Sequence, residues 1–147
     1  MYPNRVDILL VEDSSDDAEL TTRELKKHDM AGNLFHVQNG AEALDFIFAT
    51  GKYATTRNIG NILKVVLLDI QMPKVNGIET LKKIKSDDRT RATPVVMLTS
   101  SKEDPDIQKC YSLGANSYIV KPVNFEGFAD AIRNLGLYWL SMNKPPE

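Results

Sequence analysis

The sequence predicts an α/β domain built on a doubly wound sheet of five parallel strands, with helices on both faces. Two observations lead to this fold class. Short apolar runs rich in Val, Leu and Ile alternate with amphipathic segments, as expected for strands buried beneath helices. Most of these runs also end at a charged or hydroxyl residue. Right-handed crossovers leave few topologies, of which the flavodoxin-like order 2-1-3-4-5 is the common one for five strands.

The central predicted strand begins at Lys64 and breaks off at Asp69, a carboxylate that follows an apolar run. In open α/β sheets the ligand crevice lies outside the carboxyl ends of the strands. Asp69 is therefore expected to face a site. The other predicted strands cover residues 6–11, 34–38, 94–98 and 117–120.

Helices are predicted between and after these strands. Ser14 or Ser15 caps the first, which runs to about Asp29, and Asn124 caps the last. Residues 41–49 form an amphipathic helix with Ala43, Leu44, Ile47 and Phe48 on one face; Ile78, Leu81 and Ile84 mark the inner face of the next, and a further helix ends at Gly114. Residues 50–62 show no clear period and are expected to form a long surface connection.

The bulk properties fit one domain, residues 1–147, with a core of about 6–135 and a C-terminal helix extension of about 136–147. The net charge of -2 gives no electrostatic argument for binding nucleic acid or an anionic membrane. No secretory signal and no apolar run of about 20 residues occurs, so we expect a cytoplasmic protein. The single Cys110 excludes an intrachain disulfide.

Polar residues follow four of the five predicted strands and should meet at one edge of the sheet. They are Glu12, Asp13, Asp69, Thr99 and Lys121. Three carboxylates cannot share a small space as anions without a counter-charge. A divalent cation with oxygen ligands answers this need, and Mg²⁺ suits one or two carboxylates plus a phosphate. A cation, an ammonium and a hydroxyl near one carboxylate are what phosphoryl transfer to that carboxylate requires.

The motifs, in this order, resemble those of the receiver domain of two-component response regulators, a CheY-like family. They are Val11-Glu12-Asp13, Leu68-Asp69 with Met72-Pro73 and Asn76-Gly77, Thr99-Ser100, Gly114-Ala115 and Lys121-Pro122. The resemblance spans about residues 6–135. The sequence departs from the common family pattern at Glu12, where an aspartate is usual. The longer glutamate side chain can still reach a cation through water.

The resemblance implies the following roles. Asp69 is the phosphoacceptor for a histidine kinase, and the chain is not an enzyme beyond promoting its own phosphorylation and dephosphorylation. Mg²⁺ is held by Glu12, Asp13, Asp69 and the backbone carbonyl of Gln71. Thr99 and Lys121 contact the acyl phosphate, the Lys121-Pro122 bond is cis, and Thr99 acts with Tyr118 as a conformational switch.

A closer resemblance is to stand-alone regulators that partner bacterial phytochromes. It rests on Glu12-Asp13-Ser14, the extended connection before the central strand, residues 115–123 and the Tyr138-Trp139-Leu140 ending. We expect a single-domain regulator whose output passes through protein contacts. A homodimer through helix four, strand five and helix five is predicted, helped by Tyr138 and Trp139.

Several residues have a plainer structural interpretation. Asp16 and Asp17 are assigned to the helix macrodipole, and His28 and His36 to structural or exposed positions. Two alternative functions remain. One is a receiver-like adaptor that is not phosphorylated. The other is a flavin-binding electron carrier, which the acids after the first strand disfavour because they repel phosphate.

Overall fold

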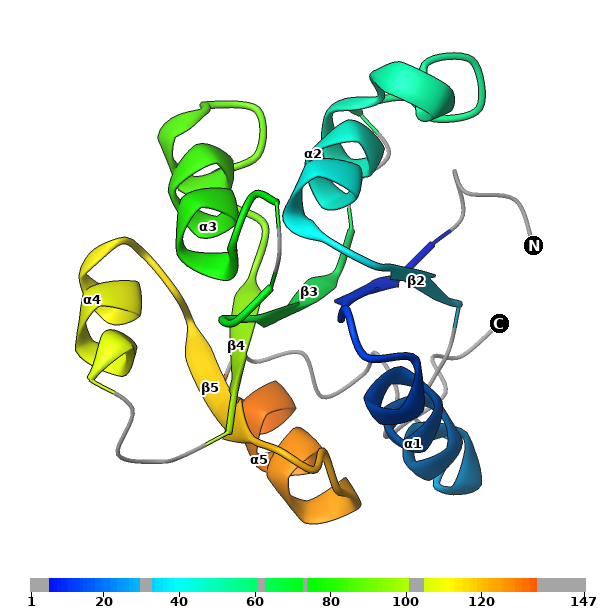
Figure 1. The fold of residues 1–147 in the computed structure, drawn as a ribbon, viewed down its shortest axis with the longest axis vertical. Helices are drawn as coiled ribbons and strands as arrows, with labels where there is room; N and C mark the ends of the chain where they lie inside the picture. The colour runs from blue at the N-terminus through cyan, green and yellow to red at the C-terminus, as the bar shows by residue number, and fades with distance from the viewer. Residues whose placement is uncertain (1–5, 30–32, 61–62, 73, 101–104, 135–147) are drawn as a thin grey trace.

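The structure is a computed structural model that describes residues 6–29, 33–60, 63–72, 74–100 and 105–134. Within these ranges, parallel strands form a five-stranded sheet in the order β2-β1-β3-β4-β5, which confirms the predicted topology (Figure 1). The strands are β1 (Ile8–Val11), β2 (Leu34–Val37), β3 (Val65–Asp69), β4 (Val95–Thr99) and β5 (Ser117–Val120).

Helices cover both faces of the sheet. The helices α1 (Ser15–Lys27) and α5 (Phe125–Asn134) lie on one face. On the other face lie α2 (Gly40–Phe48), α3 (Gly77–Ser86) and α4 (Asp106–Ser112), as Figure 1 shows. A short 3₁₀ turn, η2 (Gly51–Tyr53), follows α2. The three central strands β1, β3 and β4 are buried along their whole length, as expected for strands covered on both faces.

Four helices begin with the same capping device. In each, a polar side chain accepts a hydrogen bond from the backbone N–H three residues later, which satisfies one of the unpaired donors of the first turn. The capping residues are Ser14, Asn39, Asn76 and Asn124, with distances of 3.2, 2.8, 2.9 and 2.7 Å. Because these residues follow the strands closely, α1, α2, α3 and α5 all start near the carboxyl edge of the sheet.

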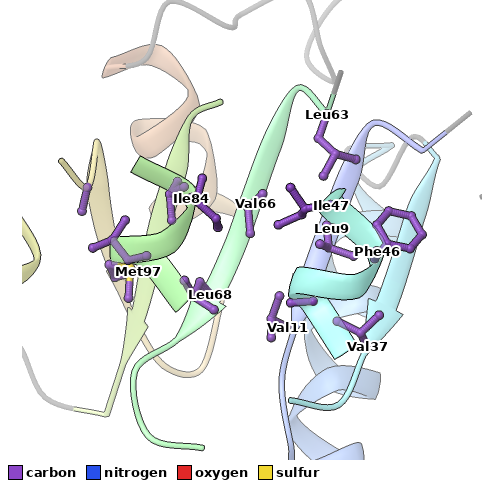
Figure 2. Close-up of a cluster of buried hydrophobic side chains, with 14 of the residues drawn as sticks. Leu9, Val11, Val37, Phe46, Ile47, Leu63, Val66, Leu68, Ile84 and Met97 are labelled. Carbon is purple, nitrogen blue, oxygen red and sulfur yellow. The ribbon is translucent and has the colours of Figure 1, made fainter. Parts of the chain in front are cut away.

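The hydrophobic core is divided by the sheet. Figure 2 shows the cluster beneath α2 and α3, in which Phe46 and Ile47 of α2 meet strand residues such as Leu9 and Val66. Phe46 is fully buried and stacks on Phe35 with ring centroids 4.8 Å apart. Of the face predicted from the sequence, Ala43 and Ile47 are buried as expected, whereas Leu44 and Phe48 are only partly buried. The buried face of α2 is therefore turned toward Phe46 relative to the predicted face.

The connection after α2 is largely exposed, as predicted, but some residues in and just after it pack against the core. Tyr53, Arg57 and Leu63 are buried. The Arg57 guanidinium lies 4.2 Å from the Phe46 ring centroid, and its Nε donates to the Phe46 carbonyl at 3.2 Å. Arg57 therefore anchors the connection to α2 through Phe46.

The cis Lys121-Pro122 peptide bond is present as expected. The predicted extension at residues 136–147, with Tyr138 and Trp139, lies outside the described residues, as do Pro73 and Leu135. The assignment of the whole chain to one domain stays a prediction.

Candidate functional site

Strand register brings the first acids together. In the parallel ladder Val11 pairs with Leu68, so the next residues on each strand, Glu12 and Asp69, leave the sheet side by side. Asp69 is 3% exposed and Glu12 is fully buried, whereas Asp13 is exposed. One carboxylate oxygen from each of these three residues lies within 4.8 Å of the others. The structure therefore gathers the predicted acidic trio at the carboxyl edge of the sheet.

Lys121 reaches this cluster from the end of β5. Its Nζ lies 3.1 Å from Glu12 Oε1 and 3.3 Å from Asp69 Oδ2, and its side chain is 17% exposed. The Lys121 N–H donates to the Thr99 carbonyl at 2.7 Å, which fixes the start of the Lys121 side chain beside β4. Lysine, threonine and acids thus come from four different strand ends.

The buried charges perturb one another. Burial, together with the contact with Asp69, raises the pKa of Glu12 from 4.5 to about 8, against the opposing effect of Lys121. Burial lowers the pKa of Lys121, but the hydrogen bond to Asp17 and the charges of Asp69 and Glu12 outweigh it, and the net change is upward. The site therefore holds a firmly protonated ammonium and an excess of acid.

The backbone around Glu12 is held from the edge strand. The Glu12 N–H donates to the Val37 carbonyl at 3.0 Å, and His36 Nε2 lies 2.7 Å from the Glu12 carbonyl. A carbonyl can only accept, so His36 Nε2 carries the proton in this contact. His36 is therefore structural, as predicted, and it supports the first acid of the site.

A close approach of the backbone explains the Asn76-Gly77 pair. A Cβ atom at Gly77 would lie 2.2 Å from the Asp69 carbonyl oxygen, a distance that no side chain tolerates. The Gly77 N–H donates to the Ile70 carbonyl at 3.1 Å. Glycine at this position allows α3 to start directly against the end of β3, so the loop that carries Gln71 folds tightly over the site.

The residues present fit a hard divalent cation. Such cations prefer carboxylate and carbonyl oxygens, and Mg²⁺ takes few protein ligands and keeps several waters. Glu12, Asp13 and Asp69 supply carboxylate oxygens in one cluster. Gln71, whose carbonyl was predicted as a ligand, follows Asp69 by two residues, and its N–H donates to Asp69 Oδ1 at 3.2 Å. The excess of acid over ammonium gives a bound cation its electrostatic stabilisation.

Thr99 and Tyr118, the predicted switch pair, occupy different environments. Thr99 is buried at the end of β4, whereas Tyr118 is 37% exposed on β5. The Tyr118 ring packs edge-on against Tyr111 of α4, with centroids 6.2 Å apart at 82°. Tyr118 thus points outward, on a face with Tyr111 and Val120, which are also exposed.

Asp17 belongs to the site, although the sequence analysis assigned it only to the helix dipole. Its Oδ2 lies 3.1 Å from Lys121 Nζ. The available signal was its place in the first turn of α1, because a helix that starts after β1 opens at the same edge as Glu12 and Asp13. Asp16 is exposed, in keeping with the plainer assignment.

An acidic cluster beside a lysine, at the carboxyl edge of a 2-1-3-4-5 sheet, defines the receiver class of signalling proteins. Comparison with family models agrees: the model described as the response regulator receiver domain matches residues 8–133. The chain therefore belongs to the response regulator receiver family. Among the described residues, no helix has the length and apolarity to cross a membrane.

Similar proteins include members of the predicted phytochrome group and another regulator. The structure of the bacteriophytochrome response regulator RtBRR is similar with a TM-score of 0.83 and 44% identity, covering 95% of this chain and 82% of that one. The response regulator Rcp1 of Synechocystis sp. is 32% identical, covering 90% of this chain and 88% of its own. The probable methanogenesis regulatory protein FilR2 of Methanothrix harundinacea is 38% identical, covering 95% and 86%.

The resemblance to regulators of the phytochrome group is thus confirmed at the level of sequence and fold. Rcp1 also has a structure in a Mn²⁺-bound form, to which this chain is 31% identical with a TM-score of 0.72, over 95% of this chain and 98% of that one. Receiver domains bind a divalent cation in an acidic pocket, and this chain has an acidic cluster of Glu12, Asp13 and Asp69 that could hold one.

Proposed function

We propose that this chain is a response regulator that accepts a phosphoryl group on Asp69 from a sensor histidine kinase. The observation that carries the proposal is the contact of Lys121 Nζ with Asp69 Oδ2 at 3.3 Å, within the cluster of Glu12, Asp13 and Asp69. An acceptor carboxylate needs positive charge beside it to receive a dianionic group. Lys121 supplies such a charge from the end of a separate strand.

The reaction transfers a phosphoryl group from a phosphohistidine donor to the Asp69 carboxylate. An Asp69 carboxylate oxygen attacks the phosphorus of a phosphohistidine; the new O–P bond forms as the N–P bond breaks, and the imidazole nitrogen leaves with the electron pair and takes up a proton. Hydrolysis removes the phosphoryl group from Asp69: water attacks phosphorus, the Asp69 carboxylate leaves with its electron pair, and inorganic phosphate is released. The chain promotes both steps by holding the reacting oxygen among fixed charges.

Each residue of the site has its own role in this proposal. Glu12, Asp13, Asp69 and the Gln71 carbonyl would hold Mg²⁺, which, when bound, offsets the negative charge of the phosphoryl oxygens. Lys121 pairs with a phosphoryl oxygen, and the Thr99 hydroxyl donates to another. Asp69 and Glu12 are buried, whereas Asp13 lies on the exposed side of the cluster.

Output passes through the face formed by α4, β5 and α5. Tyr118 lies outward there, and its inward swing together with Thr99 would change the shape of this face. Tyr111, Tyr118 and Val120 expose apolar surface on it, which supports assembly of a homodimer through this face.

The kinase is of the phytochrome type in this proposal. Support comes from the similarity to proteins named as a bacteriophytochrome response regulator and Rcp1. Such a kinase and its regulator meet in the cytoplasm, where we place this chain.

Labelling tests the acceptor assignment. The protein should be phosphorylated in Mg²⁺ by acetyl phosphate and by a phosphorylated phytochrome-type histidine kinase, and Asp69→Asn should abolish both reactions. Asp88→Asn is the matched control, because Asp88 is an exposed acid in the turn after α3. Mg²⁺-dependent labelling that persists in Asp69→Asn would refute the acceptor assignment.

A further inference from the structure

The Lys121 ammonium has three carboxylate partners that differ in burial. Glu12 and Asp69 are buried, with side chains 0% and 4% exposed, whereas the side chain of Asp17 is 44% exposed. The distances are similar, at 3.1, 3.3 and 3.1 Å. An ammonium has three N–H donors, so each donor here has one carboxylate acceptor. All three N–H donors of the Lys121 ammonium are therefore engaged by carboxylates.

Asp17 is fixed in place by the start of α1. Its own N–H donates to the Ser14 hydroxyl at 3.2 Å, in the cap of the helix. The Asp17 carboxylate comes from a different element than the acids at the strand ends, and it meets Lys121 from the solvent side. It is a geometrically defined partner on the rim of the site.

A phosphoryl oxygen can bind Lys121 only if one of the three acceptors gives way. Loss of the contact with Asp69 leaves a buried charge without its partner, and loss of the contact with Glu12 leaves a fully buried acid without its hydrogen-bond donor; both are costly. Loss of the contact with Asp17 exposes a carboxylate that water already reaches, and exposed pairs contribute little. Asp17 is therefore the acceptor that an incoming phosphoryl oxygen replaces at Lys121.

We propose that Asp17 is a positioning residue that holds the Lys121 ammonium in the resting site and competes with the incoming phosphoryl group for it. This inference rests on the proposed function of Asp69 as phosphoacceptor. The contact of the Asp17 carboxylate with this site is its ion pair with the Lys121 ammonium. Asp17 acts through Lys121, and so it sets how readily the lysine is recruited.

The test uses beryllofluoride, a phosphoryl mimic, at saturating Mg²⁺. Asp17→Asn keeps the size of the side chain and the backbone N–H of the cap but removes the charge. We expect beryllofluoride to bind this variant about two- to fivefold more tightly than the wild type, as loss of a partly exposed ion pair predicts. Labelling by acetyl phosphate should speed up by a similar factor.

Two further variants separate positioning from general effects. Asp16→Asn removes the same charge from the same helical turn, at an exposed position that is not among the described partners of Lys121. It should change beryllofluoride affinity by less than the Asp17 variant does. Asp17→Glu restores the carboxylate and should return the affinity toward the wild-type value. Circular dichroism melting identifies any variant that fails to fold. If Asp17→Asn fails to fold, Asp17→Ser, which also removes the carboxylate, takes its place and should bind beryllofluoride more tightly than the wild type.

The outcomes are distinct. If wild-type protein neither binds beryllofluoride nor becomes labelled, the proposed function and this inference both fall. If the wild type does both, but Asp17→Asn binds with equal or lower affinity, only the role of Asp17 is overturned. Equal gains in Asp16→Asn and Asp17→Asn would also overturn it, since the effect would then be one of net charge.

Discussion

The buried Glu12 should make the metal-free protein less stable as the pH rises. Its pKa is raised from 4.5 to about 8, chiefly by burial and by Asp69. Between these two values the folded state keeps a proton that the unfolded chain has released, so the folded state binds more protons. Stability is therefore full below the lower value and is lost as the pH rises through the higher one. Glu12→Gln removes the titrating group.

The size of the effect follows from the linkage between proton binding and folding. One proton bound more tightly in the folded state changes the free energy of unfolding by about 1.36 kcal/mol per pH unit. Between about pH 5 and about pH 7, the wild type should lose roughly 2 to 3 kcal/mol relative to Glu12→Gln. Bound Mg²⁺ offsets the charge of ionised Glu12 and should flatten this difference.

Urea unfolding in EDTA, at several pH values for both proteins, measures the difference directly. Comparing wild type with variant cancels the titrating groups that lie away from Glu12, so the difference reports on Glu12 together with its partners Asp69 and Lys121. Glu79→Gln, which removes an exposed glutamate from the first turn of α3, is the control. If the wild type and Glu12→Gln keep a constant difference across this pH range, Glu12 titrates at its ordinary value and the account of a strained buried acid is wrong.

Two further predictions concern packing and assembly. Gly77→Ala should lower the free energy of unfolding by more than about 2 kcal/mol in urea and slow labelling, because its Cβ would strike the Asp69 carbonyl at 2.2 Å. Gly127→Ala in α5, whose Cβ would meet its nearest atom at 3.3 Å, should unfold near the wild-type midpoint. Sedimentation velocity at micromolar concentration should give a dimer mass, with Tyr111→Glu shifting it toward monomer and Leu20→Glu on α1 leaving it unchanged. A monomer mass for the wild type, with and without beryllofluoride, would contradict the dimer.

The sheet and most of the site were predictable because their signals are local. A buried parallel strand appears in the sequence as a continuous apolar run, and the residue that ends the run lies at the carboxyl edge. That rule alone placed Asp69, Thr99 and Lys121 together. The predicted caps at Ser14 and Asn124 were equally local, since capping uses a side chain and a backbone donor three residues apart.

Two features were not predictable in this way, because they depend on contacts across the fold. Arg57 is buried because its guanidinium stacks on Phe46, a pairing that no period in the connection reveals. Asp17 looks like an ordinary first-turn acid, and only the reach of Lys121 from β5 gives it a second role. Both involve long polar side chains, whose direction depends on their partners rather than on the local backbone.

Stability and function oppose each other at this site. The carboxylates that must bind a cation and receive a phosphoryl group are the ones that burial makes costly, and a single ammonium, Lys121, serves three of them. A substitution such as Glu12→Gln should therefore stabilise the metal-free fold while weakening the affinity for Mg²⁺. Because the repulsion is relieved by a bound cation, ligand binding and folding are linked, and the cation should stabilise the wild type more than any variant with fewer acids.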